Sequence, residues 1–223
     1  GADVLELGNE WQHQPFWLAP SYNLIPPTRQ AEITAEVAKG IRAKYPTFPI
    51  ITNGMSPEAN QQNPYLWWPQ FWDCNATNMT AGKFNGVGLH PYCYPELATT
   101  NPIQWNPMLQ VPSISSAAKQ RGLSGEIWLT EFGAPGFATN APVIRNIALT
   151  EAQQDANFKA YFTVIKQHEA AGIKLNGMCI CTLFDGQSVT TSVEQGLGLI
   201  RTDGTKKAAW TTVKNFANEL VAV

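Results

Sequence analysis

The sequence predicts an α/β fold in which a parallel sheet is covered by outer helices. Short apolar runs of strand length alternate with segments of helical periodicity, and the runs end in polar residues or glycine. Strands that alternate with helices in this way favour a parallel sheet with helices outside it. At 223 residues the chain is long enough for one substantial core, so we expect a single domain over residues 1–223.

Five strands are expected, at residues 4–9, 49–55, 86–90, 126–133 and 175–184. The third contains two glycines, Gly86 and Gly88, which leave room for neighbouring side chains in a crowded interior. In the fourth, strict alternation of side chains would place Ile127, Leu129 and Glu131 on one face.

Five helices are expected, at residues 28–44, 67–72, 113–121, 150–168 and 207–221. Thr28 is the expected N-cap of the first, whose apolar stripe toward the sheet consists of Ile33, Val37, Ile41 and Tyr45. The run Thr150-Glu151-Ala152-Gln153 has the pattern of a capping box at the start of the fourth. Residues 134–149 read as a loop rich in Gly, Pro and Asn.

Composition excludes several classes of function. Charged residues make up 14% of the chain and the net charge is −2, so no basic field is available for a nucleic-acid backbone. No apolar run approaches the roughly 18 residues of a membrane span, and no basic region followed by an apolar segment opens the chain, so we expect a soluble, mature protein. The eight Trp lie mainly in turn-rich stretches, where they either stack on sugar rings or pack down loops.

The four cysteines lack the CxxC spacing and the His neighbours of a zinc site. We expect Cys179 and Cys181 to be buried thiols on one side of a strand, whereas Cys74 and Cys93 are either a disulfide or two free thiols. Two glycosylation patterns begin at Asn75 and Asn78. They leave the compartment open, with an extracellular, secreted or virion-associated setting favoured.

Polar side chains recur where the predicted strands end. They are Asn9, Glu10, Asn53, His90, Tyr92, Glu131 and Asp185. The carboxyl ends of parallel strands carry the active site in folds of this kind, because their loops converge there. Two carboxylates on facing strands match the needs of glycoside hydrolysis, and a separation of roughly 5–5.5 Å would favour retention of configuration over inversion.

Several motifs in order resemble the retaining glycoside hydrolases of clan A, which share a (β/α)8 TIM barrel. The motifs are Leu7-Gly8-Asn9-Glu10, Ile51-Thr52-Asn53-Gly54, Val87-Gly88-Leu89-His90-Pro91-Tyr92, Trp128-Leu129-Thr130-Glu131-Phe132-Gly133 and Gly198-Leu199-Ile200 with Asp203-Gly204-Thr205. The sequence is most similar to family 39 and its bacterial and phage relatives. The match covers most of the chain and corresponds to barrel strands four to eight.

The resemblance implies a role for each matching residue. Glu10 would be the general acid/base and Glu131 the nucleophile, while Asn9 would bind the sugar 2-hydroxyl. His90 and Tyr92 would orient the nucleophile or the sugar, although a strand-end His is often structural. The expected cleft residues are Trp11, His13 and Trp17, with Asn53, Cys181 and Asp185 as further substrate contacts. No metal or cofactor is expected.

Two positions and one region depart from the family pattern. Cys181 stands where an aromatic platform usually ends strand eight, and Gly8 where a Trp often precedes the Asn-Glu pair. Nothing resembles strands one to three, although eight strands close such a barrel. We expect a separate polypeptide or a cleaved N-terminal segment to supply them; a fragment or a reduced barrel is the alternative.

The function expected from these features is retaining hydrolysis of O-glycosidic bonds in a poly- or oligosaccharide. The competing expectation is a weakly active or inactive carbohydrate-binding or structural module within a larger assembly, which the altered Cys181 position and the missing strands favour. A non-hydrolytic enzyme of the same architecture would need a phosphate loop or a metal cluster, and the sequence has neither motif.

Overall fold

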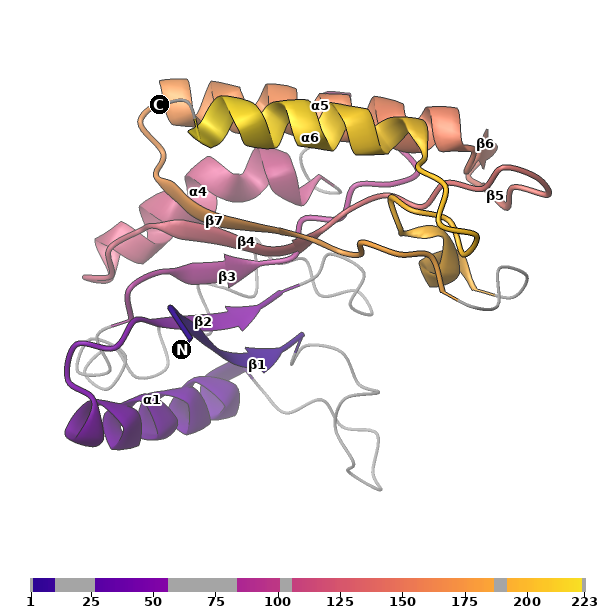
Figure 1. The fold of residues 1–223 in the computed structure, drawn as a ribbon. Coiled ribbons are helices and arrows are strands. Elements are labelled where there is room, and N and C mark those ends of the chain that lie inside the picture. The colour runs from indigo at the N-terminus through magenta and orange to yellow at the C-terminus, as the bar shows by residue number, and fades with distance from the viewer. Residues whose placement is uncertain (1, 11–26, 56–83, 101–105, 187–191, 222–223) are drawn as a thin grey trace.

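In the described residues five parallel strands lie side by side in chain order, as a two-stranded sheet followed by a three-stranded sheet (Figure 1). The computed structural model describes residues 2–10, 27–55, 84–100, 106–186 and 192–221. The strands are β1 (Leu5–Asn9), β2 (Ile50–Gly54), β3 (Val87–Leu89), β4 (Ile127–Phe132) and β7 (Leu175–Ile180). A bridge between Ile51 and Gly86 links β2 to β3. The five predicted strands are therefore confirmed, with shorter bounds.

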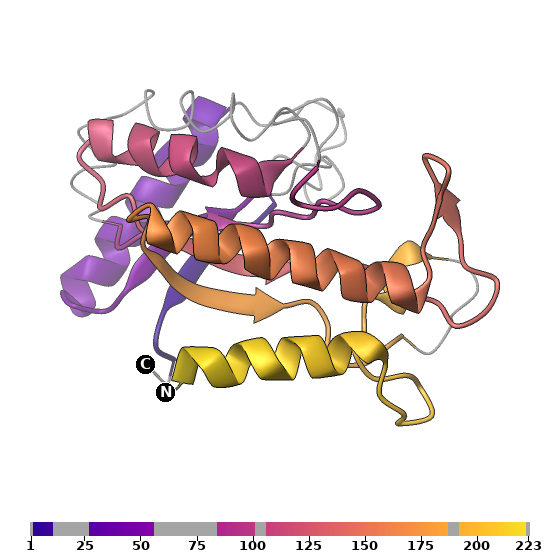
Figure 2. The same cartoon turned by 90° about the horizontal axis from the view of Figure 1, so that it is seen from above.

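In the described parts of the chain four α-helices pack outside the strands: α1 (Pro27–Lys44), α4 (Pro107–Gln120), α5 (Glu151–Ala170) and α6 (Ala208–Val221). Helix α1 lies beside β1 and β2, and α4, α5 and α6 lie on the side of β4 and β7 (Figure 1). Seen from above, α5 and α6 run side by side (Figure 2). The helix predicted at 67–72 falls outside the described residues.

The hydrophobic core lies between the sheet and the helices. Strands contribute Leu7, Ile50, Val87, Leu89, Ile127, Leu129 and Phe132, and helices contribute Met108, Val111, Ile114, Phe158, Tyr161 and Phe162 among others. Phe132 stands edge-on to three rings of α5, which joins β4 firmly to that helix. The other face of the sheet carries Trp128, which packs between Gly86 and Gly177 and is only partly buried.

The face that α1 presents to the sheet differs from the prediction. Ala31, Ala35 and Ala38 are completely buried, whereas Val37 is 46% exposed and Tyr45 53% exposed. A spacing of four residues drifts by about 40° per step around a helix of 3.6 residues per turn, so the predicted stripe cannot stay on one face. The alanines follow an i, i+4, i+7 pattern, and their small side chains allow the helix to approach the sheet closely.

Helix α4 begins six residues before the expected start at Ser113. Asn106 caps it, since its side chain accepts a hydrogen bond from the amide of Leu109, and Pro107 occupies the first turn. Pro112 lies inside the helix and cannot donate to the carbonyl of Met108. That carbonyl instead accepts a hydrogen bond from Nε2 of His168, at 2.6 Å. The histidine that compensates for the proline comes from α5.

The start of α5 agrees with the predicted capping pattern, because the Thr150 hydroxyl accepts a hydrogen bond from the amide of Gln153 at 3.2 Å. The preceding loop contains an unpredicted hairpin formed by β5 (Val143–Ile144) and β6 (Ile147–Ala148). Its turn residues Arg145 and Asn146 both have positive φ, as a two-residue hairpin turn requires. The turn has no glycine, so a two-residue hairpin was difficult to predict at this point.

None of the helices in the described parts of the chain combines the length and the apolar character that crossing a membrane would need.

Candidate active site

The end of β1 positions Glu10 through an unusual backbone path. Gly8 has φ 100° and Glu10 has φ 44°, both in the left-handed region that L side chains rarely adopt. The amide of Glu10 still donates to the carbonyl of Gly54 at 2.9 Å, which extends the ladder between β1 and β2. A tryptophan at position 8 would be strained in this conformation, so the glycine there has a local structural reason.

The end of β3 places His90 in the centre of the site. Its side chain is completely buried, and its amide donates to the carbonyl of Met55 at 2.8 Å. Tyr92 follows two residues later, and its hydroxyl donates to Oε2 of Glu131 at 3.0 Å. Burial and the neighbouring side chains of Cys181 and Glu131 raise the pKa of Tyr92 well above its ordinary value. The hydroxyl therefore remains a hydrogen-bond donor across the working pH range.

Glu131 lies on a different face from the one that strict alternation predicted. Ile127 and Leu129 are completely buried toward the helices, and the register between β4 and β7 shifts between Leu129 and Phe132. Phe132 returns to the helix side. The irregularity turns Glu131 toward His90 and Tyr92, so the prediction that Ile127, Leu129 and Glu131 share a face was wrong.

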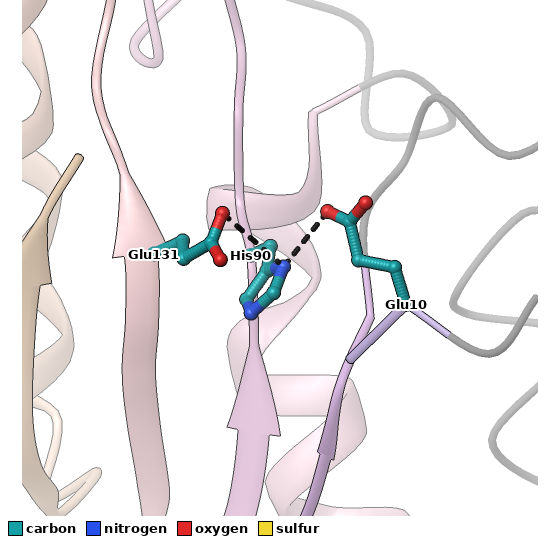
Figure 3. A group of neighbouring side chains, drawn as sticks. All are labelled: Glu10, His90 and Glu131. Carbon is teal, nitrogen blue, oxygen red and sulfur yellow. Dashed lines mark hydrogen bonds and ion pairs between the residues drawn. The ribbon is translucent and has the colours of Figure 1, made fainter. Parts of the chain in front are cut away.

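The two strand-end glutamates face the same imidazole (Figure 3). Nδ1 of His90 lies 2.8 Å from Oε1 of Glu10 and 3.8 Å from Oε2 of Glu131. One ligand atom from each of Glu10, His90 and Glu131 lies within 4.8 Å of the others. Glu10 and Glu131, which were predicted to form a pair although 121 positions separate them, therefore lie close together at the carboxyl end of the sheet.

A third carboxylate, Glu6 on β1, lies beneath this pair and was not among the predicted site residues. Its Oε1 accepts a hydrogen bond from the Thr130 hydroxyl at 3.0 Å and lies 3.7 Å from Nε2 of His90. Burial raises the pKa of Glu6 to about 7, against the opposing effects of His90 and of its hydrogen bonds. The sequence feature that could have pointed to Glu6 is its charge in the middle of an otherwise apolar strand.

Cys181 adjoins the site from the end of β7. It is partly buried, its amide donates to the carbonyl of Phe132 at 3.0 Å, and burial raises the pKa of its thiol. The related prediction for Cys179 was wrong, because this thiol is exposed. Strand β7 is an edge among the described strands, so its side chains keep contact with solvent. Cys93 is a buried free thiol, and Cys74 lies outside the described residues.

The remaining predicted site residues lie in different environments. Asn9 ends β1 and is exposed, and Asn53 is completely buried in β2 with no hydrogen-bond partner for its amide among the described residues. Asp185 forms a buried ion pair with Lys207 at 2.7 Å. The ion pair holds the carboxylate of Asp185 in place, and the expected substrate contact stays a prediction. The predicted cleft residues Trp11, His13 and Trp17 lie outside the described residues.

Glu10, His90 and Glu131 together offer one imidazole nitrogen and two carboxylate oxygens, a donor set that suits a divalent first-row metal. The same atoms are engaged with one another and with Tyr92 by hydrogen bonds of 2.8 and 3.0 Å. Two carboxylates flanking one polar cluster also suit acid/base and nucleophilic chemistry.

A sheet of parallel strands with outer helices and polar residues at its carboxyl end is the arrangement of (β/α) barrel enzymes. No protein-family model matches the chain, and no curated protein matches it. Solved structures do match, and those compared are TIM-barrel glycoside hydrolases of clan A. The chain therefore has a glycosidase-like α/β fold that corresponds to part of a barrel.

Three of these solved structures illustrate the similarity to this chain. A family 39 glycoside hydrolase from Bacteroides cellulosilyticus WH2 matches with a TM-score of 0.63 and 17% identity, covering 96% of this chain and 40% of that one. Fungal β-1,4-galactanases match with a TM-score of 0.62 and 14% identity, covering 95% and 61%. A family 17 β-1,3-glucanosyltransferase from Rhizomucor miehei matches with a TM-score of 0.52 and 13% identity, covering 93% and 62%. The chain thus spans less than two thirds of each.

Proposed function

We propose that this chain is the catalytic portion of a retaining glycoside hydrolase that cleaves O-glycosidic bonds of a poly- or oligosaccharide. The observation that carries the proposal is the meeting of Glu10 and Glu131 around His90, with the nearest atoms within 4.8 Å. Retaining enzymes hold their two carboxyl groups roughly 5–5.5 Å apart, whereas inverting enzymes leave roughly 6.5–9.5 Å for a water molecule. A distance within 4.8 Å between the nearest atoms is compatible with the shorter, retaining spacing, and we assign retention on this ground. The order of the sequence motifs favours a relationship to glycoside hydrolase family 39.

In the first step Glu131 attacks the anomeric carbon and Glu10 transfers its proton to the departing glycosidic oxygen. Oε2 of Glu131 is held by Tyr92, which leaves Oε1 to form the bond to carbon. Oε1 of Glu10 lies 2.8 Å from Nδ1 of His90, and we assign delivery of the proton to the carboxyl group of Glu10. The bond from the anomeric carbon to the leaving oxygen breaks as the bond to Glu131 forms.

In the second step the ionised Glu10 takes a proton from water, and the resulting hydroxide displaces Glu131 from the anomeric carbon. The configuration is inverted twice and so retained. We assign Asn9, which is exposed at the end of β1, to the sugar 2-hydroxyl, and Trp11, His13 and Trp17 to the cleft. The partly buried Cys181 would give the sugar a smaller and less apolar contact surface than an aromatic ring.

A covalent intermediate gives the direct test of this proposal. Incubation with a panel of 2-deoxy-2-fluoro glycosides that carry good leaving groups is expected to add one fluoroglycosyl unit to the chain. Intact-mass measurement detects the adduct, and peptide mapping is expected to place it on Glu131.

The matched control is Glu126→Gln, which removes a carboxylate from the opposite end of β4 and should label like the wild type. Labelling of a residue other than Glu131 would overturn the assignment of the nucleophile. Binding to immobilised glycans with no adduct on any donor would select the competing reading, a carbohydrate-binding or structural module.

We further propose that additional β/α units complete the barrel, supplied by a cleaved N-terminal segment or a second polypeptide. Among the described strands β1 and β7 lie at the two ends of the strand order, and each carries an exposed side chain, Leu5 in β1 and Cys179 in β7. Exposed edges of a parallel sheet are seldom tolerated. Native mass spectrometry of the active protein is expected to give a mass well above 24.5 kDa. Full activity in a species of 24.5 kDa would contradict this.

A further inference from the structure

The hydroxyl group of Tyr161 on α5 connects the two chain segments that carry Tyr92 and Glu131. It accepts a hydrogen bond from the amide of Cys93 at 2.7 Å and donates one to the carbonyl oxygen of Gly133 at 3.2 Å. An amide N–H can only donate and a carbonyl oxygen can only accept, so both roles of the hydroxyl group are fixed. Cys93 directly follows Tyr92, and Gly133 comes shortly after Glu131. One side-chain oxygen therefore bridges the segments that follow β3 and β4.

This bridge lies beyond the point where the pairing of β3 with β4 ends. Their register ends at the pair Leu89 and Leu129, and both Tyr92 and Glu131 come after that pair. Ladder hydrogen bonds keep paired strands at a constant spacing, but they do not determine the spacing past the last pair. The Tyr161 hydroxyl group supplies a connection there. In the same place Tyr92 donates to Oε2 of Glu131 at 3.0 Å.

Both sides of the bridge are anchored. The Tyr161 ring is completely buried and lies edge-on to the ring of Phe132 in β4, with centroids 5.4 Å apart. The buried Sγ of Cys93 donates to the side-chain oxygen of Asn106, the residue that caps α4, at 3.0 Å. Since the ring is packed against β4 and the thiol is bonded to α4, the hydroxyl group determines how the two segments lie relative to each other.

We propose that Tyr161 is a positioning residue for the nucleophile: its hydroxyl group holds the ends of β3 and β4 at the separation at which Tyr92 binds Glu131. This inference rests on the proposed glycosidase function. Without the hydroxyl group, the buried amide of Cys93 and the buried carbonyl of Gly133 lose a partner, so the two segments shift to find another. A displacement of about 1 Å can lower the rate of the chemical step by about 10²-fold.

The contact between Tyr92 and Glu131 can be measured without any substrate. In the chain labelled with tyrosine that carries ¹³C at Cζ, the shift of this carbon reports the hydrogen bonding of each phenol, and Tyr92→Phe identifies the Tyr92 signal by its loss. Glu131→Ala gives the reference for a Tyr92 hydroxyl group that has lost its acceptor. Tyr161→Phe removes only the oxygen atom and keeps the ring. In this variant the Tyr92 signal is expected to move from its wild-type position toward the reference.

The matched control is Ser115→Ala, which also removes a buried hydroxyl group from an outer helix. Ser115 lies on α4, and its hydroxyl group donates to the carbonyl oxygen of Gly125 at 2.6 Å, just before the start of β4. This hydrogen bond is at the end of β4 opposite the site, so its loss should leave the Tyr92 signal in place. An unchanged Tyr92 signal in folded Tyr161→Phe overturns the proposal. An equal movement of the signal in both variants overturns it as well.

Labelling by 2-deoxy-2-fluoro glycosides gives a second readout, because it isolates the attack of Glu131. In Tyr161→Phe the maximal rate of labelling is expected to fall by about tenfold to about 10²-fold. The glycoside concentration that gives half of this rate should change by less than about twofold, since the buried Tyr161 does not contribute to binding of the sugar. Ser115→Ala should match the wild type in both quantities. Circular dichroism verifies that both variants are folded at the temperature of the assay.

A maximal labelling rate of folded Tyr161→Phe within about twofold of the wild type would reject the positioning role. An equal loss of rate in Ser115→Ala would reject it too, because any buried hydroxyl group would then have the same effect. If the wild-type chain forms no adduct with any donor, the proposed function fails, while the Tyr92 signal still decides whether Tyr161 holds Tyr92 against Glu131.

Discussion

Replacing Glu131 by Gln is expected to lower kcat by between about 10⁴-fold and about 10⁶-fold, the range that loss of one member of a nucleophilic unit costs. The amide keeps the size of the carboxylate and can still contact Tyr92, which lies 3.0 Å from Oε2 in the wild type. It cannot form the glycosyl ester through which the reaction proceeds. Initial rates on the aryl glycoside that the wild type hydrolyses best give the measurement.

A smaller side chain at the same position tests the stereochemistry. In Glu131→Gly, added azide or formate can occupy the space of the carboxylate and attack the anomeric carbon. The expected product is a glycosyl azide of inverted configuration, identified by proton NMR. The control Glu126→Gln should hydrolyse normally and give no azide product. Turnover of Glu131→Gln within about tenfold of the wild type would reject Glu131 as the nucleophile.

Replacing Glu10 by Gln is expected to lower kcat/KM by about 10²-fold to 10⁴-fold on substrates with poor leaving groups. The amide has no proton that it can transfer, although it retains the contact with Nδ1 of His90. Dinitrophenyl glycosides leave without assistance, so formation of the glycosyl-enzyme should be nearly normal. Hydrolysis of the intermediate should then become slow, which predicts a burst of dinitrophenolate equal to the enzyme concentration.

Azide provides the matching test for Glu10. With Glu10→Gln and a dinitrophenyl donor, azide should accelerate turnover, because it needs no general base to attack the intermediate on Glu131. The expected glycosyl azide has retained configuration, opposite to the product of Glu131→Gly. An identical loss of activity on all leaving groups, with no burst and no azide effect, would remove Glu10 from the acid/base role.

The architecture and the carboxylate pair were predictable from the sequence because both depend on regular features. Alternating strands and helices give parallel strands, and their carboxyl ends converge, so Glu10 and Glu131 could be paired before their distance was known. The start of α5 was predictable because the cap at Thr150 is a local interaction.

Other features depend on contacts that local patterns do not contain. The register shift near Leu129 turns Glu131 to the other face of β4, and no residue in the strand signals it. Pro112 is tolerated in α4 because a histidine of α5 takes over the freed carbonyl. Glu6 was missed because alternation along β1 does not distinguish a carboxyl group that faces the polar interior from one that faces solvent.

The contacts at the carboxyl end of the sheet join very distant parts of the chain. Glu6 and Thr130 are 124 positions apart, Glu10 and His90 are 80 apart, and Tyr92 and Glu131 are 39 apart. We expect such contacts to form late in folding, because closing long loops costs conformational entropy before the contacts can stabilise the chain. No single β/α unit contains the site, so recovery of activity during refolding should follow assembly of the entire sheet and lag behind recovery of helical signal.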